Sequence, residues 1–137
     1  MGEVREKIKL TNNDDIIELR KGRITKEQVR AIEIDGVIDT GATLLNLPEE
    51  IVKELGLTIS GYIQIAYANN ARELRPRAET IRLELLGRDG RFDCVVGPLG
   101  SPVLIGQIVL ETLDLIVDCT TGEVKPAHEE GIVYSAM

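Results

Sequence analysis

Apolar and polar residues alternate over short stretches along most of the chain, a period typical of strands with one buried face. The clearest case is residues 80–85, where isoleucine and leucine alternate with threonine, arginine and glutamate. Turn-forming residues interrupt the pattern at short intervals, so we expect many short strands in a mostly β domain. Strands are expected over residues 16–19, 29–34, 37–38, 62–67, 80–85, 92–96, 103–105, 115–117 and 123–124.

Three segments carry strong turn signals. Asp35-Gly36 is a dipeptide that favours tight hairpins, and it predicts a hairpin between the strands on either side. Asn69-Asn70 predicts a second turn and residues 88–90, Arg-Asp-Gly, a third. The strands are therefore expected to pair largely with their neighbours in sequence.

One or two short helices interrupt the strands. Pro48 precedes a segment with two early acids, and Gly56 follows it, which is the usual arrangement of a helix start and stop. The apolar positions after Gly106 predict a further helical turn. The chain has 137 residues, enough for one domain. We divide it into a loose lead-in over residues 1–28, a folded domain over 29–124, and a tail or interface strand over 125–137.

Composition excludes several classes of function. The chain carries 16 basic and 23 acidic residues, for a net charge of −7, which disfavours nucleic acid and anionic membranes as partners. Aromatic residues make up 3%, too few for a base-stacking surface. The single histidine, His128, excludes zinc sites built on two histidines, and no metal or cofactor is expected.

Cysteine content and the first residues bear on location. Cys94 and Cys119 are too few for a disulfide framework, and we interpret both as reduced thiols. The first ten residues lack an apolar core typical of a secretion signal, and no stretch reaches the length of a membrane span. A cytoplasmic location is therefore expected.

The candidate chemistry lies in residues 37–43, Val-Ile-Asp-Thr-Gly-Ala-Thr. A run of β-branched residues places Asp39 at the end of a buried strand, and the small residues after it permit a tight turn and close approach of backbone. An aspartate that only closes a strand-to-turn junction would give the same pattern. The short motif leaves both interpretations open.

Further motifs accompany this one in a fixed order. The segments are residues 38–43, then Leu47-Pro48, then residues 95–98, then residues 103–118. Together they resemble the retropepsin-like aspartic proteases, and most of all their single-domain bacterial branch, over residues 29–124. The resemblance implies a retropepsin-like acid-protease barrel.

The resemblance also implies the activity of an aspartic endopeptidase on a peptide or protein substrate. In that family two aspartate carboxylates activate one water, and this chain has one Asp-Thr-Gly motif. The second carboxylate would come from Asp39 of a second copy, which implies a homodimer.

Neighbouring roles follow from the same resemblance. Thr40 would hold the two active-site loops together across the dimer axis, Gly41 would let substrate backbone approach, and Ala42 completes the loop. The family's flap, a hairpin that covers substrate, would lie around Tyr67, Ala68 and Asn69. Val103 and Leu104 would line side-chain subsites.

The chain departs from the family in two places. Retroviral members carry an aspartate–arginine pair where this chain has Thr43 and Gln107, and their flaps are glycine-rich, whereas no glycine lies between Tyr62 and Leu86. A non-catalytic dimeric module that binds a partner on the same fold is the alternative function. A small-molecule binder has little support, because no convergent polar pocket residues are visible in the sequence.

Overall fold

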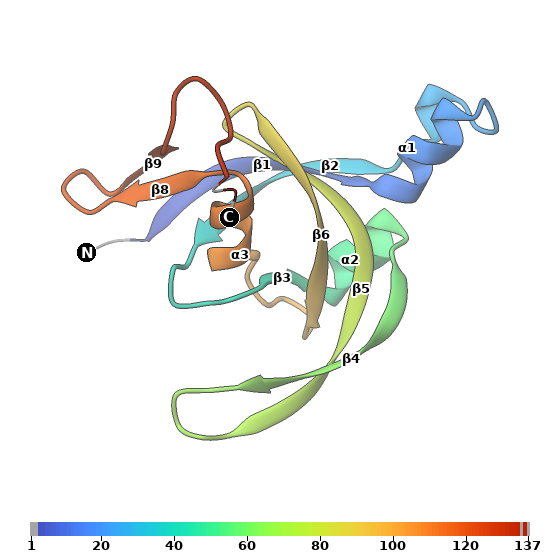
Figure 1. Cartoon of the computed structure of the whole chain (residues 1–137). Helices are drawn as coiled ribbons and strands as arrows, with labels where there is room; N and C mark the ends of the chain where they lie inside the picture. Colours follow the sequence, from blue (N-terminus) through green and yellow to red (C-terminus); the bar gives the residue numbers. More distant parts are fainter. Residues whose placement is uncertain (1–2, 135, 137) are drawn as a thin grey trace.

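The computed structural model describes residues 3–134 and 136, and strands dominate it. This confirms the predicted mostly β class, although the described residues include three α-helices where one or two were expected. Within that part of the chain, no helix is long and apolar enough to cross a membrane. The elements, labelled in Figure 1, are β1 (Val4–Asn12), α1 (Asn13–Arg20), η1 (Lys26–Gln28), β2 (Ala31–Ile38), β3 (Leu45–Pro48), α2 (Glu49–Leu55), β4 (Thr58–Ala66), β5 (Arg72–Leu85), β6 (Arg88–Gly97), β7 (Leu104–Ile105), α3 (Gln107–Thr112), β8 (Leu115–Asp118) and β9 (Glu123–Pro126).

Seven strands form one sheet that curls until it meets itself (Figure 1). The order is β1-β2-β7-β3-β6-β5-β4, and β1 also pairs with β5, so the sheet is ring-like and β4 lies outside the ring as an edge. Two pairings, β2 with β7 and β3 with β6, are parallel. These pairings place β7 beside β2 and β6 beside β3, although the partners lie far apart in the sequence. β8 and β9 form a separate antiparallel pair.

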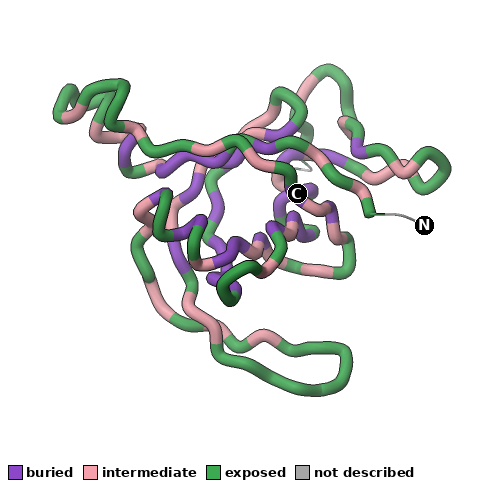
Figure 2. Tube along the Cα trace, turned by 180° about the vertical axis from the view of Figure 1, so that it is seen from behind, coloured by how far each residue is buried: buried purple, intermediate pink, exposed green. Residues whose placement is uncertain are grey.

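The interior of the ring is filled by aliphatic side chains. On β5 the predicted alternation is present, because Ile81, Leu83 and Leu85 are buried while Arg82 and Glu84 between them are only half-buried. Each fully buried side chain of this size contributes roughly 1.5–3 kcal/mol. Figure 2 shows the buried residues gathered along the ring, while the β4–β5 hairpin and the excursion through α1 are largely exposed. The ring is thus the scaffold, and the hairpin projects from it.

Two local predictions are confirmed in detail. Pro48 is the N-cap of α2, and Gly56 ends that helix in the left-handed region with φ 64°. The turn predicted at Asn69-Asn70 joins β4 to β5, with Asn70 at φ 67°. Both were predictable because the residues that start and stop these elements act locally.

The N-terminal segment differs from the expected loose lead-in over residues 1–28. β1 pairs with β2 on one side and β5 on the other, and residues 16–19, expected as a strand, lie in α1. The helix starts where Asn12 caps it by accepting a hydrogen bond from the Asp15 N–H at 3.1 Å. The Asn12 amide also donates to the Leu55 carbonyl oxygen at 2.8 Å, so this polar residue is buried with its hydrogen bonds made.

The hairpin predicted at Asp35-Gly36 is wrong, because β2 continues straight through both residues. Gly36 is needed for close packing: a Cβ built on it would lie 2.7 Å from the Ile105 Cδ1.

Two further predictions differ in position. The third turn lies at Leu86-Gly87, just before the predicted residues 88–90. Of the predicted tail, residues 125–126 belong to β9, and residues 127–134 hold no strand.

An ion pair joins Asp15 on α1 to Arg30, the residue that precedes β2. The Asp15 carboxylate accepts from Arg30 Nε at 2.9 Å, from Arg30 Nη2 at 3.0 Å and from the Arg30 backbone N–H at 3.0 Å. The Asp15 side chain is 11% exposed, and the hydrogen bond from the guanidinium is the main reason that its pKa is lowered. A carboxylate with a lowered pKa in the folded state stabilises the fold above its unfolded pKa, and this contribution is lost as the pH falls through the folded pKa.

We therefore expect Asp15→Asn to lower the free energy of unfolding at pH 7 by about 1–2 kcal/mol, because an amide cannot accept all three hydrogen bonds. The difference from the wild-type protein should shrink as the pH falls from about 4, the ordinary pKa of an aspartate, through the lower pKa of folded Asp15, because the wild-type carboxylate then becomes protonated. Urea unfolding across this pH range measures both effects. The matched control is Glu18→Gln on the same helix, whose partner Arg23 is 64% exposed and whose loss should cost little. Equal effects of the two substitutions at pH 7 would contradict the assignment.

Candidate active site

Asp39 follows the last residue of β2, and backbone hydrogen bonds fix its position. Its N–H donates to the Ile105 carbonyl oxygen at 3.0 Å, which continues the parallel pairing with β7. The chain then turns, and the Ala42 N–H donates to the Asp39 carbonyl oxygen at 3.1 Å. The Gly41 N–H donates to the Asp39 Oδ1 at 3.0 Å. The carboxylate is thus oriented by its own turn.

The start of α3 holds the other side of this turn, residues 39–43. The Gln107 N–H donates to the Ala42 carbonyl oxygen at 2.8 Å, and the Ile108 N–H donates to the Thr43 carbonyl oxygen at 3.0 Å. Gly106 permits this contact, because a Cβ at that position would lie 2.4 Å from the Leu44 carbonyl oxygen. The turn and the start of α3 are thus joined through their backbones.

The Asp39 turn borders an open groove of about 680 Å³. One wall is the turn with β3, the opposite wall is the inner face of the β4–β5 hairpin, and β6 and β7 close the side. Most of the side chains are apolar, and among the described lining residues Asp39 is the only acid. The lining residues are Asp39, Gly41, Ala42, Thr43, Leu44, Asn46, Ile63, Gln64, Ile65, Ala66, Tyr67, Arg75, Val95, Gly97, Pro98 and Leu104.

A chain of hydrogen bonds links the hairpin to the wall formed by β6. The Tyr67 hydroxyl donates to Glu73 at 3.0 Å, Arg75 Nη1 donates to the same carboxylate at 3.1 Å, and Arg75 Nε donates to the Val96 carbonyl oxygen at 2.9 Å. The hydrogen bond to Glu73 raises the pKa of Tyr67, so the phenol stays neutral as a donor. The bond near the tip therefore joins the two strands of the hairpin to each other, and Arg75 joins the hairpin to β6.

The structure brings some of the predicted site residues together and leaves others outside the groove. Tyr67 and Leu104 line the groove with Asp39, Gly41 and Ala42. The other predicted residues lie elsewhere: Thr40 is exposed beside Asp39, Ala68 and Asn69 form the hairpin turn, and Val103 is buried in the core.

Arg75 and Asn46 are among the groove residues that were not predicted as part of the site. Once the hairpin turns at residues 69–70, odd-numbered residues on both strands share a face, so Ile63 pairs with Arg75 across it. That register could have identified Arg75. Asn46 donates to the Pro102 carbonyl oxygen at 2.9 Å, a contact over 56 positions that no local pattern indicates.

A single carboxylate in an apolar groove can act as a base or as an acid, but one group cannot supply both at once. Over residues 3–134 and 136, no three histidine, cysteine, aspartate or glutamate side chains gather to hold a metal ion. Comparison of the chain with known protein families and with curated proteins found no match. The function is therefore inferred from the geometry and chemistry of the groove.

Gly106→Ala should destabilise the protein by about 1–3 kcal/mol, because the added methyl group meets fixed backbone atoms of the Asp39 turn. Gly41→Ala is the matched control: its Cβ would meet only the Asp39 Oδ1, at 3.3 Å, and we expect a change under about 1 kcal/mol. Chemical denaturation of both variants measures the difference. Equal stabilities would contradict the tight packing of the turn against α3.

Proposed function

We propose that the protein is an aspartic endopeptidase with a retropepsin-like fold, whose active site uses two Asp39 carboxylates, one from each subunit of a homodimer. One observation carries the proposal: Asp39 is the only acid among the described residues that line a groove of about 680 Å³, and its turn is fixed by backbone hydrogen bonds. The groove is partly open to solvent, which an extended peptide needs in order to enter it.

The chemistry requires two carboxyl groups in different protonation states. Two like charges in close contact cannot both ionise readily, so the pair shares one proton, as in the aspartic-protease dyad that is the standard example. The ionised carboxylate removes a proton from water as the water oxygen attacks the peptide carbonyl carbon. The protonated one donates to the carbonyl oxygen. Collapse of the tetrahedral intermediate then breaks the C–N bond, with a proton passing to the leaving nitrogen.

A two-fold axis beside Asp39 would supply the second carboxylate from an identical chain. Asp39 is half-buried and Thr40 beside it is exposed, so this edge of the groove is open to a second copy. Thr43 and Gln107 carry no charge, and a dimer would therefore rely on contacts other than the retroviral ion pair.

The groove walls suit a peptide substrate. Leu44, Ile63, Ile65, Val95 and Leu104 provide apolar surface on several sides. Extended peptides bind by main-chain hydrogen bonds, with alternate side chains in pockets. The β4–β5 hairpin, which forms the wall opposite Asp39, would then serve as the cover over a bound peptide.

The second candidate function is a non-catalytic dimeric module that binds a partner on the same fold. The hydrogen bond from the Gly41 N–H to Asp39 favours it, since an aspartate that merely closes a turn makes the same contact. The two candidates differ in whether the pair of carboxylates hydrolyses a peptide.

Asp39→Asn should lower the rate of hydrolysis by about 10²–10⁴-fold while leaving the fold unchanged. The amide oxygen can still accept from Gly41, but the amide can neither share the proton nor act as the base. The measurement is cleavage of a reduced, alkylated protein near pH 5, followed by mass spectrometry, with circular dichroism to check the fold.

The matched control is Asp35→Asn, which changes an exposed aspartate on β2 outside the groove and should retain full activity. Full activity of purified Asp39→Asn would contradict the proposal. A wild-type protein that dimerises and cleaves nothing would favour the non-catalytic module.

A further inference from the structure

The strand β4 leaves one edge of the sheet without a partner. It is the last strand in the order of the sheet, and in the part of the chain that the structure describes only β5 pairs with it. Figure 1 shows β4 as the outer strand of the projecting hairpin. The unpaired N–H and C=O groups of such an edge can bind a strand of another chain.

The hydrogen bonds of the hairpin show which backbone groups of β4 point to this edge. The Tyr67 N–H donates across the hairpin turn at 2.9 Å, and from there hydrogen-bonded and non-hydrogen-bonded pairs alternate along the two strands. Tyr62 falls in a non-hydrogen-bonded pair, and its opposite residue is Pro76, which has no N–H to donate. The N–H and C=O groups of Tyr62, Gln64 and Ala66 therefore point away from β5.

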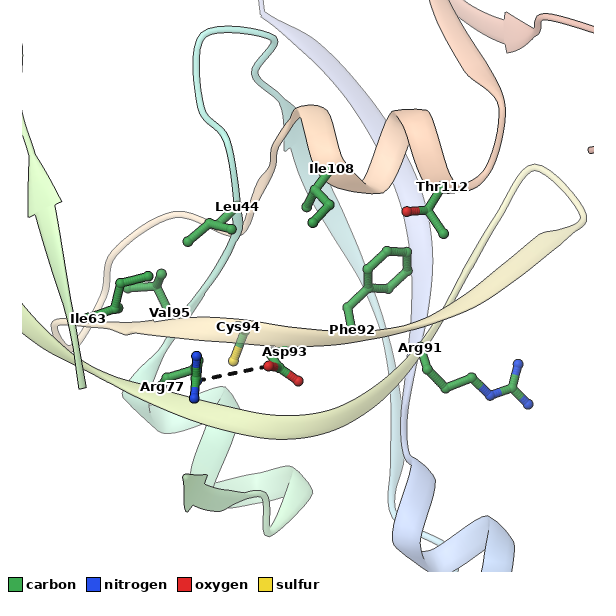
Figure 3. Close-up of a pocket in the computed structure, with 10 residues that line it drawn as sticks. All are labelled: Leu44, Ile63, Arg77, Arg91, Phe92, Asp93, Cys94, Val95, Ile108 and Thr112. Carbon is green, nitrogen blue, oxygen red and sulfur yellow. Dashed lines mark ion pairs between the residues drawn. The ribbon is translucent and has the colours of Figure 1, made fainter. Parts of the chain in front are cut away.

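The nine residues of β4, Thr58–Ala66, include no charged side chain. The whole chain has a net charge of −7, so two copies repel each other wherever their acidic surfaces meet. The charges of the hairpin lie on β5, where Arg77 pairs with Asp93 of β6 at 3.9 Å, as Figure 3 shows. Natural edge strands commonly carry a charge that opposes pairing with another copy, and β4 lacks this protection.

The regular part of β4 is complementary to itself in an antiparallel pair. The register with β5 shifts between Ile59 and Gly61, whereas residues 62–66 pair without irregularity. If a two-fold axis passes beside Gln64, the large Tyr62 lies opposite the small Ala66 of the other copy. Gln64 then lies opposite itself, so the two amide side chains can form a hydrogen bond with each other.

The same register matches the backbone and the remaining side chains. Tyr62, Gln64 and Ala66 all have their backbone groups at the edge, so the two copies form about six backbone hydrogen bonds. Ile63 lies opposite Ile65 of the other copy, and both are half-buried on the groove face. Tyr62, which is 66% exposed in the single chain, gains a neighbour.

We propose that β4 of a second copy of this chain pairs antiparallel with the β4 edge over residues 62–66, with the two-fold axis at Gln64. The contact is separate from the one proposed at Asp39, and it depends neither on that contact nor on proteolysis. It joins the sheets of the two copies into one continuous sheet.

The first test is disulfide formation under mild oxidation, in protein with Cys119→Ser because the Cys119 thiol is exposed. Gln64→Cys should give a covalent dimer, because the Cα atoms of a hydrogen-bonded antiparallel pair lie about 5.5 Å apart, within reach of a disulfide. Leu74→Cys is the matched control. Leu74 lies opposite Gln64 on β5 and is 62% exposed, but its two copies would be about 14 Å apart and should not link.

Asn69→Cys separates this contact from one made by the hairpin turns. In the proposed register the two copies of residue 69 lie about 33 Å apart, so they should not link either. The proposal is overturned if Gln64→Cys gives no covalent dimer, or if Leu74→Cys or Asn69→Cys links as readily as Gln64→Cys does.

The second test is sedimentation of Gln64→Lys without oxidation. Two lysines opposite each other at the axis should raise the dissociation constant of this contact by about tenfold or more. Leu74→Lys, one strand away from the edge, should change it by less than about threefold. Equal dissociation constants for the wild-type protein and Gln64→Lys overturn the proposal. Neither test measures catalysis, so failure of the proteolysis proposal and failure of this one are distinguishable.

Discussion

The backbone contact between the Asp39 turn and the β7–α3 junction is the constraint on which the site depends. β2 and β7 pair in parallel for only two residues, yet the hydrogen bonds continue past the strands through Asp39 and Gln107. Gly106 makes the contact possible, because backbone of the turn occupies the space of a side chain. The position of the carboxylate is therefore set by main-chain atoms, which leaves the surrounding side chains free to define the groove.

The sequence predicts those parts of the fold whose signals are local. Pro48 and Gly56 bound α2, and the asparagines at 69–70 turn the hairpin, because each acts through its own backbone preference. The turn prediction at Asp35-Gly36 is wrong because Gly36 is needed for tertiary packing: the Ile105 side chain approaches it too closely for any other residue. The N-terminal strand was missed because its partners lie far along the chain, and Asn12 and Asp15 look like loop residues until Leu55 and Arg30 satisfy them.

The candidate site likewise contains residues that a local sequence pattern predicts and residues that only the tertiary structure reveals. The short motif around Asp39 is visible in sequence, and Tyr67 and Leu104 lie with it in the groove. Arg75 and Asn46 depend on strand register and on a contact distant in sequence, which no local pattern encodes. Among its described residues the groove holds one acid per chain. The proposed chemistry needs two carboxyl groups, so it requires a second copy of the chain.

The most direct test of this link is to mix wild-type and Asp39→Asn subunits at constant total concentration and let them exchange. If each active site needs Asp39 from both chains, activity varies with the square of the wild-type fraction. An equal mixture then retains about one quarter of the wild-type rate. Retention of about one half, in proportion to the wild-type chains present, would show that one carboxylate per site suffices and would contradict the two-chain active site.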